Sequence, residues 1–229
     1  MADQLVTDDA TDTRTLRRSP LAHLAQQMRE QSVTGERGVA LREIPFLTMV
    51  GLRVVPGTAA ASAVETAAGM PLPDGHGQVT GSPDGTALLW LGPDEFLLVG
   101  PEGSGPAEIG AEGTDLGDAG SDDAGTAAGL ARALGTEPGQ AVDLSANRTT
   151  LELSGPSARA VLEKACPIDL HPRVFGPGTA VATTLGPVQV LLWQTAEQAY
   201  RLLPRASFAD YTARWLLDAM TEYAAPEVP

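Results

Sequence analysis

The sequence predicts an α+β protein built from two αβ halves that are related by an internal repeat. Each half begins with a short apolar alternation, at Leu52 and at Leu151, which is followed by a Pro/Gly break, a helical stretch and a Pro stop. A tryptophan-containing apolar run then follows in each half, around Trp90 and Trp193. The two leucines are 99 residues apart and the two tryptophans 103, so the two spacings nearly agree. We therefore expect the tryptophans to occupy equivalent places in the two halves.

Composition divides the 229-residue chain into four segments, within a length typical of one or two domains. Residues 1–18 are polar, rich in Thr and Asp and aperiodic, which predicts a disordered tail. Residues 19–99 and 126–223 are expected to form the N-terminal and C-terminal αβ halves. Between them, residues 100–125 hold ten Gly or Pro and seven acids, too few apolar groups to offset the entropy of ordering. This segment is predicted to be an acidic, solvated insertion.

A helix is predicted at the start of the first half. Ser19 is a candidate N-cap, and Pro20 suits the first helical position. Apolar residues then follow at helical spacing, namely Leu21, Leu24, Ala25 and Met28. Because this helix lies outside both copies of the repeat, we expect it to dock on a partner rather than to complete a core.

The rest of each half is expected to alternate strands and helices, with turns at Gly and Pro. In the first half the expected elements are strands within 41–55, a helix over 58–69, a hairpin of 86–91 and 95–99, and a closing helix recovered behind the insertion at 126–134. In the second they are a strand over 149–153, a helix opened by Pro156, a hairpin of 180–185 and 188–193, a strand over 200–203 and a final helix capped by Ser207. The final helix is expected to bury the stripe Phe208, Tyr211, Thr212, Trp215 and Ala219.

Composition also excludes several classes of protein and site. The net charge is −14, and no cluster of Lys and Arg is present that could neutralise phosphates, so nucleic acid is not an expected partner. Cys166 is the single cysteine, which excludes a disulfide framework and a multi-cysteine metal site. No apolar run reaches the roughly 18 residues typical of a membrane-spanning helix, and residues 1–18 lack the apolar centre of a secretory signal. We expect a cytoplasmic protein without a membrane partner.

The sequence lacks the common motifs of catalytic, nucleotide and metal sites. We accordingly assign no catalytic, cofactor-binding or metal-binding residue. The densest polar cluster is the stretch from Asp143 to Arg148, which also contains Ser145 and Asn147. These side chains could clamp an anion or a carboxylate, but turn and cap chemistry with a structural ion pair could equally account for them. We favour a structural or subunit-interface role for Asp143, Asn147 and Arg148.

Eight short motifs, taken together, resemble the gamma subunit of heterotetrameric sarcosine oxidase. They are collinear and cover residues 19–99 and 140–222, nearly everything outside the tail and the insertion. Each motif is weak by itself, whereas eight in the same order are specific. The motifs are Ser19-Pro-Leu, Leu41-Arg-Glu-Ile-Pro-Phe-Leu47, Leu52-Arg-Val, Trp90-Leu-Gly-Pro-Asp-Glu-Phe96, Asp143-Leu-Ser-Ala-Asn-Arg-Thr149, Ser154-Gly-Pro, Cys166-Pro-Ile-Asp-Leu-His-Pro172 and Leu202-Leu-Pro-Arg-Ala-Ser-Phe-Ala-Asp-Tyr211.

The resemblance implies a fold, a complex and a reaction. The family is similar to a shortened folate-binding aminomethyltransferase, which implies two ferredoxin-like αβ halves. It also implies a complex of alpha, beta, gamma and delta chains that oxidises sarcosine to glycine, with hydrogen peroxide and formaldehyde or methylene-tetrahydrofolate as the other products. FAD, FMN, NAD and zinc are then expected in the other subunits, tetrahydrofolate is expected to serve the complex, and this chain is expected to be non-catalytic. The alternative is a free-standing folate-binding or aminomethyl-transfer protein.

Overall fold

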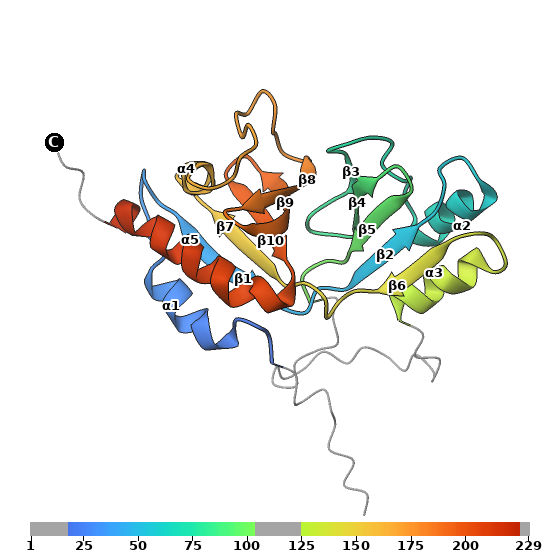
Figure 1. The fold of residues 1–229 in the computed structure, drawn as a ribbon, viewed down its shortest axis with the longest axis horizontal. Coiled ribbons are helices and arrows are strands. Elements are labelled where there is room, and N and C mark those ends of the chain that lie inside the picture. Colours follow the sequence, from blue (N-terminus) through green and yellow to red (C-terminus); the bar gives the residue numbers. More distant parts are fainter. Residues whose placement is uncertain (1–17, 104–124, 225–229) are drawn as a thin grey trace, which may run out of the picture.

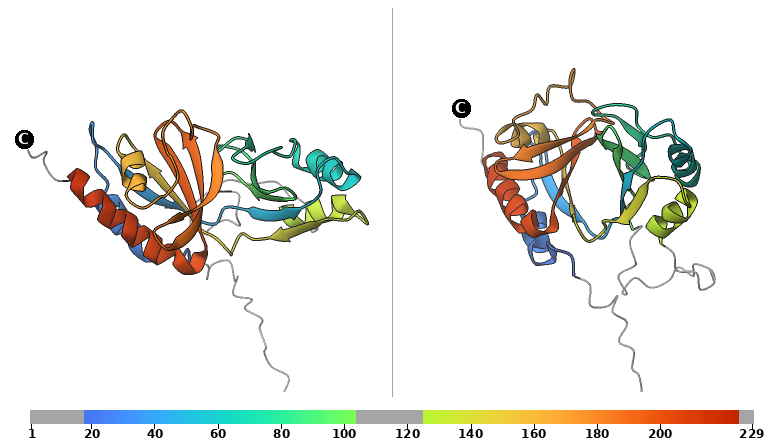
Figure 2. Two further views of the ribbon diagram at one scale, coloured as in Figure 1. Left: turned by 45° about the horizontal axis from the view of Figure 1, so that its top comes forward. Right: turned by 45° about the vertical axis from the view of Figure 1, so that its right-hand side comes forward.

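The computed structural model describes residues 18–103 and 125–224, which form two five-stranded antiparallel sheets with helices on their outer faces (Figure 1). The predicted α+β class is confirmed. The two sheets pack against each other, so the order of layers is helices, sheet, sheet, helices (Figure 2). The expected disordered tail and most of the expected acidic insertion lie outside the described residues.

The first sheet has the strand order β3-β4-β5-β2-β6, and α2 (Ala59–Ala68) and α3 (Thr126–Leu134) pack on its outer face. Helix α2 begins where the Thr58 hydroxyl accepts a hydrogen bond of 3.3 Å from the N–H of Ala61. It ends at Gly69, whose φ of 71° suits glycine. The strands are β2 (Met49–Arg53), β3 (Val79–Gly81), β4 (Ala87–Gly92), β5 (Glu95–Val99) and β6 (Gln140–Asp143).

The second sheet has the strand order β1-β7-β10-β9-β8. Helices α4 (Ala158–Glu163) and α5 (Ala209–Ala224) pack on its outer face, together with the N-terminal helices η2 (Ala22–Leu24) and α1 (Ala25–Glu30). A short helix, η3 (Ala206–Phe208), leads into α5. The strands are β1 (Ala40–Ile44), β7 (Thr150–Ser154), β8 (Ala180–Leu185), β9 (Val188–Ala196) and β10 (Ala199–Pro204).

A third core lies between the two sheets. It combines apolar side chains from the facing surfaces of both, which are at most a few per cent exposed. Burial of this surface holds the halves together, because each fully buried Leu or Ile side chain contributes about 1.5–3 kcal/mol. Its members include Ile44, Met49, Leu89, Leu97, Leu191, Trp193 and Leu203.

The two sheets exchange strands. β1 comes early in the chain but pairs with β7 of the second sheet, from Ala40 opposite Ser154 to Ile44 opposite Thr150. Conversely, β6 comes just before β7 but pairs with β2 of the first sheet. The strands are therefore not divided as we expected from residues 19–99 and 126–223, because β1 and β6 each complete the sheet of the other half.

The two tryptophans do not occupy equivalent places. Trp90 packs with the helix-facing core of the first sheet, whereas Trp193 is buried in the core between the sheets. The strand registers give the reason: Trp90 is in one cross-strand row with Leu52, but Leu192, not Trp193, is in the row of Leu151. Because neighbouring residues of a strand point to opposite faces, this shift of one residue turns the second tryptophan around. The repeat expected from the tryptophan spacing is wrong in this respect.

Two helix expectations also differ from the structure. The N-terminal helices, which we expected to dock on a partner rather than to complete a core, do complete one, since Leu21, Leu24 and Met28 are buried against the second sheet. In α5 the buried stripe is rotated from the expected one: Phe208 and Tyr211 are 49% and 46% exposed. The buried side of the helix consists of Ala209, Thr212, Ala213, Leu216, Leu217, Ala219 and Met220.

A row of charged side chains crosses the inner face of the second sheet. Arg42 of β1, Glu152 of β7 and Arg201 of β10 are directly opposite one another in the strand register. The Arg42 Nε donates to Glu152 Oε1 at 2.7 Å, and its two terminal nitrogens donate to the Glu102 carboxylate at 2.7 and 3.0 Å. The hydrogen bond with Glu102 is the largest cause of a pKa of Arg42 raised above its ordinary value.

The same row connects the two sheets. Arg201 is 5% exposed, and its guanidinium donates to the carbonyl oxygen of Pro83 at 2.9 Å, in the turn between β3 and β4. Its Nε lies 3.6 Å from Glu152 Oε2, and its Cζ lies 5.5 Å from the centre of the Trp193 ring. Since Glu102 follows β5 of the first sheet, both ends of the row bind that sheet.

Gly155 allows the exchanged strand β1 to approach closely. Its φ is +117°, and an added Cβ would lie 2.5 Å from the carbonyl oxygen of Gly38. Gly155→Ala should therefore lower the free energy of unfolding by on the order of 3 kcal/mol, through backbone strain and overlap together. Gly178→Ala is the matched control, because its φ is +84° and nothing lies within 4 Å of the added carbon. Urea unfolding that showed equal losses would contradict the role of the close approach.

Glu152 supplies a negative charge to the buried Arg201. Glu152→Gln should lower the free energy of unfolding by about 3 kcal/mol, because a buried guanidinium loses its countercharge. Glu163→Gln removes the exposed pair with Arg159 at 3.5 Å and should change it by less than about 0.5 kcal/mol. Denaturant titration of both variants measures the difference. A Glu152→Gln variant as stable as the Glu163→Gln control would show that the row contributes nothing to stability.

Candidate functional site

The predicted polar cluster lies where the chain passes from β6 of the first sheet to β7 of the second. Asp143 ends β6, and its carboxylate accepts hydrogen bonds from the N–H and the hydroxyl of Ser145 at 2.9 and 2.6 Å. The Ser145 hydroxyl oxygen in turn accepts from the N–H of Met49 at 3.0 Å. Asp143 thus shapes the turn that ties this crossover to β2.

Asn147 and Arg148 lie beside the segment that leads from β10 into η3. The carbonyl oxygen of Asn147 accepts from the N–H of Ala206 at 2.9 Å, and the Asn147 side chain is exposed. Arg148 forms an antiparallel bridge with Arg205 and donates from its guanidinium to the carbonyl oxygen of Leu203 at 2.8 Å. The crossover is therefore fixed to the second sheet by backbone hydrogen bonds.

Arg148 is a partly buried cation beside another cation. Burial is the largest cause of a pKa held below the ordinary value for arginine, and the positive charge of Arg205 acts in the same direction. Glu95 acts in the opposite direction. Over the described ranges, no carboxylate lies within 4 Å of the Arg148 or Arg205 guanidinium. Arg148 and Asp143 therefore do not form an ion pair with each other.

The structure thus separates the three predicted residues. It brings Asn147 and Arg148 together with Arg205, and it uses Asp143 in the turn. Sequence reasoning missed Arg205, although the residue stands in one of the eight motifs. Its pairing with Arg148 joins segments 57 positions apart and has no local sequence signal.

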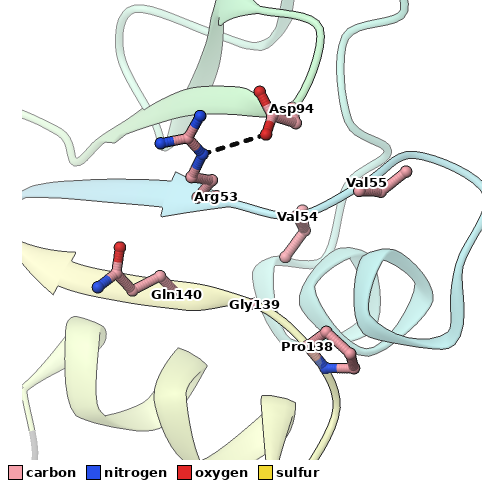
Figure 3. Close-up of a pocket in the computed structure, with 7 residues that line it drawn as sticks. All are labelled: Arg53, Val54, Val55, Asp94, Pro138, Gly139 and Gln140. Atoms are coloured by element: carbon pink, nitrogen blue, oxygen red, sulfur yellow. Dashed lines mark hydrogen bonds and ion pairs between the residues drawn. The ribbon is translucent and has the colours of Figure 1, made fainter.

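A surface pocket of about 320 Å³ lies at the far end of the first sheet, between Arg53, Val54 and Val55, Asp94 and the segment 138–140 (Figure 3). The Arg53 Nε donates to Asp94 Oδ2 at 3.1 Å, so its charge is already paired. None of the unpartnered buried polar atoms in the described residues lines this pocket. The pocket therefore contains no buried, unpartnered polar atom that would indicate a bound ligand.

The part of the chain that the structure describes lacks two further features. It contains no group of three or more His, Cys, Asp or Glu side chains with the arrangement of a metal site. None of its helices combines the length and the apolar character needed to cross a bilayer.

Comparison with known proteins identifies the family. Residues 54–222 match the model of the "Sarcosine oxidase, gamma subunit family". A sarcosine oxidase subunit gamma from Arthrobacter sp. is 51% identical over 217 residues, which cover 95% of this chain and 96% of the relative. That of Corynebacterium sp. (strain U-96) is 49% identical over 224 residues, or 98% of this chain and all of the relative.

Solved structures agree with the sequence relatives. A chain of heterotetrameric sarcosine oxidase from Corynebacterium sp. U-96, in complex with pyrrole 2-carboxylate, superposes with a TM-score of 0.82 at 50% identity, and covers 93% of this chain and all of that one. The glycine cleavage system aminomethyltransferase T from Bartonella henselae gives a TM-score of 0.59 at 17% identity over 88% of this chain and 57% of that enzyme, which shows a shared fold alone. The family match over most of the chain and the half-identical relatives show that this chain belongs to the sarcosine oxidase gamma subunit family.

Proposed function

We propose that the chain is a non-catalytic gamma subunit that supports the assembly of a heterotetrameric sarcosine oxidase. The observation that carries the proposal is the 50% identity, at a TM-score of 0.82, to a chain of a solved heterotetrameric sarcosine oxidase. Its partners are then the alpha, beta and delta subunits. The complex oxidises sarcosine to glycine, with hydrogen peroxide and formaldehyde or methylene-tetrahydrofolate as the other products.

In this proposal the chemistry belongs to the other subunits. They would hold FAD, FMN, NAD and zinc, and the complex would use tetrahydrofolate, as the family resemblance implies. In the described part of the chain, many charged side chains form ion pairs within the chain, as in the row of Arg42, Glu152 and Arg201. Paired and buried charges of this kind fit a structural role better than proton transfer, which needs a group within reach of a substrate.

The alternative, a free-standing folate-binding or aminomethyl-transfer protein, has weaker support. It rests on the likeness to an aminomethyltransferase, which is 17% identical and extends well beyond this chain, since only 57% of that enzyme is covered. A shared fold at this distance does not carry a shared activity. The relatives that are about half identical are all gamma subunits.

We also infer that the two sheets are two copies of one ferredoxin-like αβ unit. The support is their matching strand order, β3-β4-β5-β2-β6 against β8-β9-β10-β7-β1, in which each sheet is completed by the strand that precedes the other half. Such an arrangement brings the two crossovers close to the centre. The hydrogen bond of 3.0 Å between the Met49 N–H and Ser145 Oγ links them there.

Arg148 is the residue with which we test the assembly role. Arg148→Ala should weaken the association of the chain with the other subunits by about 2–5 kcal/mol, the usual cost of truncating one side of a buried interfacial charge contact. The complex that still forms should keep its sarcosine turnover per bound flavin. Both quantities are measured on one preparation, with Arg132→Ala on the exposed face of α3 as the control. If turnover per flavin collapsed in an intact four-subunit complex, Arg148 would have a role in catalysis, and the proposal of a non-catalytic subunit would be wrong.

A further inference from the structure

Two arginines face each other where β10 leads into η3. Arg148 and Arg205 form an antiparallel bridge, which is closed by hydrogen bonds from Thr149 N–H to the Pro204 carbonyl and from Ala206 N–H to the Asn147 carbonyl. Residues directly opposite each other in such a pair project to the same side, and like charges there are destabilising. The free chain therefore carries a local electrostatic cost at this point.

Several arginines of the described residues are neutralised by carboxylates. Arg42 and Arg201 share Glu152, Arg53 pairs with Asp94, and Arg214 pairs with Asp210 at 2.9 Å. Within the described ranges, neither Arg148 nor Arg205 has a carboxylate within 4 Å. The same holds for a few exposed arginines, such as Arg29, Arg132 and Arg173, but Arg148 is half-buried and lies directly opposite a second arginine.

The nearest charges do not remove the cost. Arg148 is half-buried, and its guanidinium hydrogen bond goes to the uncharged carbonyl of Leu203 at 2.8 Å. Glu95 opposes the effect of Arg205 on the pKa of Arg148, but burial and Arg205 together outweigh it. A partly buried guanidinium without a countercharge is costly, and a carboxylate that arrived from outside would offset the cost.

Exposed aromatic side chains adjoin the arginine pair along the chain. Phe208 follows Arg205 by three residues, its N–H donates to the Arg205 carbonyl at 2.8 Å, and its side chain is 49% exposed. Tyr211, one turn further on, is 46% exposed. Arginine together with Phe and Tyr is the composition enriched in the cores of protein interfaces.

We propose that this surface, consisting of Arg148, Arg205, Phe208 and Tyr211, docks an acidic segment of another subunit of the oxidase, with a carboxylate seated between the two guanidinium groups. The proposal rests on the assembly role given above and specifies the partner's chemistry. Charge complementarity is the argument for this occupant: two adjacent unpaired cations can hold one carboxylate through four or more N–H donors.

The test is co-expression of the tagged chain with the other three subunits, followed by measurement of association at low and high salt. Arg148→Glu and Arg205→Glu should each weaken association at least about tenfold. Arg132→Glu, which makes the same change of charge on α3, should leave it unchanged. The association of the wild-type chain should weaken as salt is added, and that of an Arg148→Gln, Arg205→Gln double variant should depend less on salt.

A second measurement separates docking from folding. Arg205→Gln relieves the like-charge pair, so the thermal midpoint of the full chain should stay the same or rise while association weakens. Association that fell only in step with the thermal midpoint would overturn the proposal in favour of a structural role. If both charge reversals assembled like wild type, the acidic docking segment would be refuted and the assembly role would stand. A wild-type chain that failed to join the other subunits would refute the assembly role itself.

Discussion

Each of the two sheets takes one edge strand from the other half of the chain, and most of the structure depends on this exchange. After β1 the chain passes from the second sheet to the first, where it forms β2. After β6 it passes from the first sheet back to the second, where it forms β7. The two crossovers are then held side by side, through the Met49 and Ser145 hydrogen bonds. Because the exchanged strands bind through regular antiparallel ladders, the halves cannot separate without breaking both sheets.

The exchange also determines where charges can be placed. In the second sheet, β1 brings Arg42 beside Glu152, which completes a row that reaches the buried Arg201. The crossover from β6 to β7, in contrast, places Arg148 beside Arg205, and no carboxylate of the described residues accompanies them. In the first arrangement the charges are paired within the chain, whereas in the second the two arginines have no carboxylate among the described residues, and we propose that a partner supplies one. This contrast is the physical reason for locating the assembly surface at the crossover.

The shared fold with an aminomethyltransferase has a limited meaning here. A fold hosts many functions, and the function resides in particular side chains grafted on it. In this chain the space between the sheets is filled by apolar side chains and by the charged row, with Trp193 and Arg201 among its buried members. The two halves therefore enclose a packed interior between the sheets.

The sequence by itself determined the local elements. Thr58 and Gly69 mark the ends of α2, and the Gly186 turn joins β8 to β9, because caps and turns are set by residues adjacent in sequence. It also determined the family, since eight ordered motifs span nearly the whole chain. The tertiary structure alone decided which sheet β1 and β6 join, on which face of its sheet Trp193 lies, and with which carboxylate an arginine pairs. The placement of β1 and β6 depends on strand partners that are at least 87 residues away in the sequence. The face of Trp193 depends on a register in which a shift of one position turns every side chain to the other face. Neither is encoded in a local pattern.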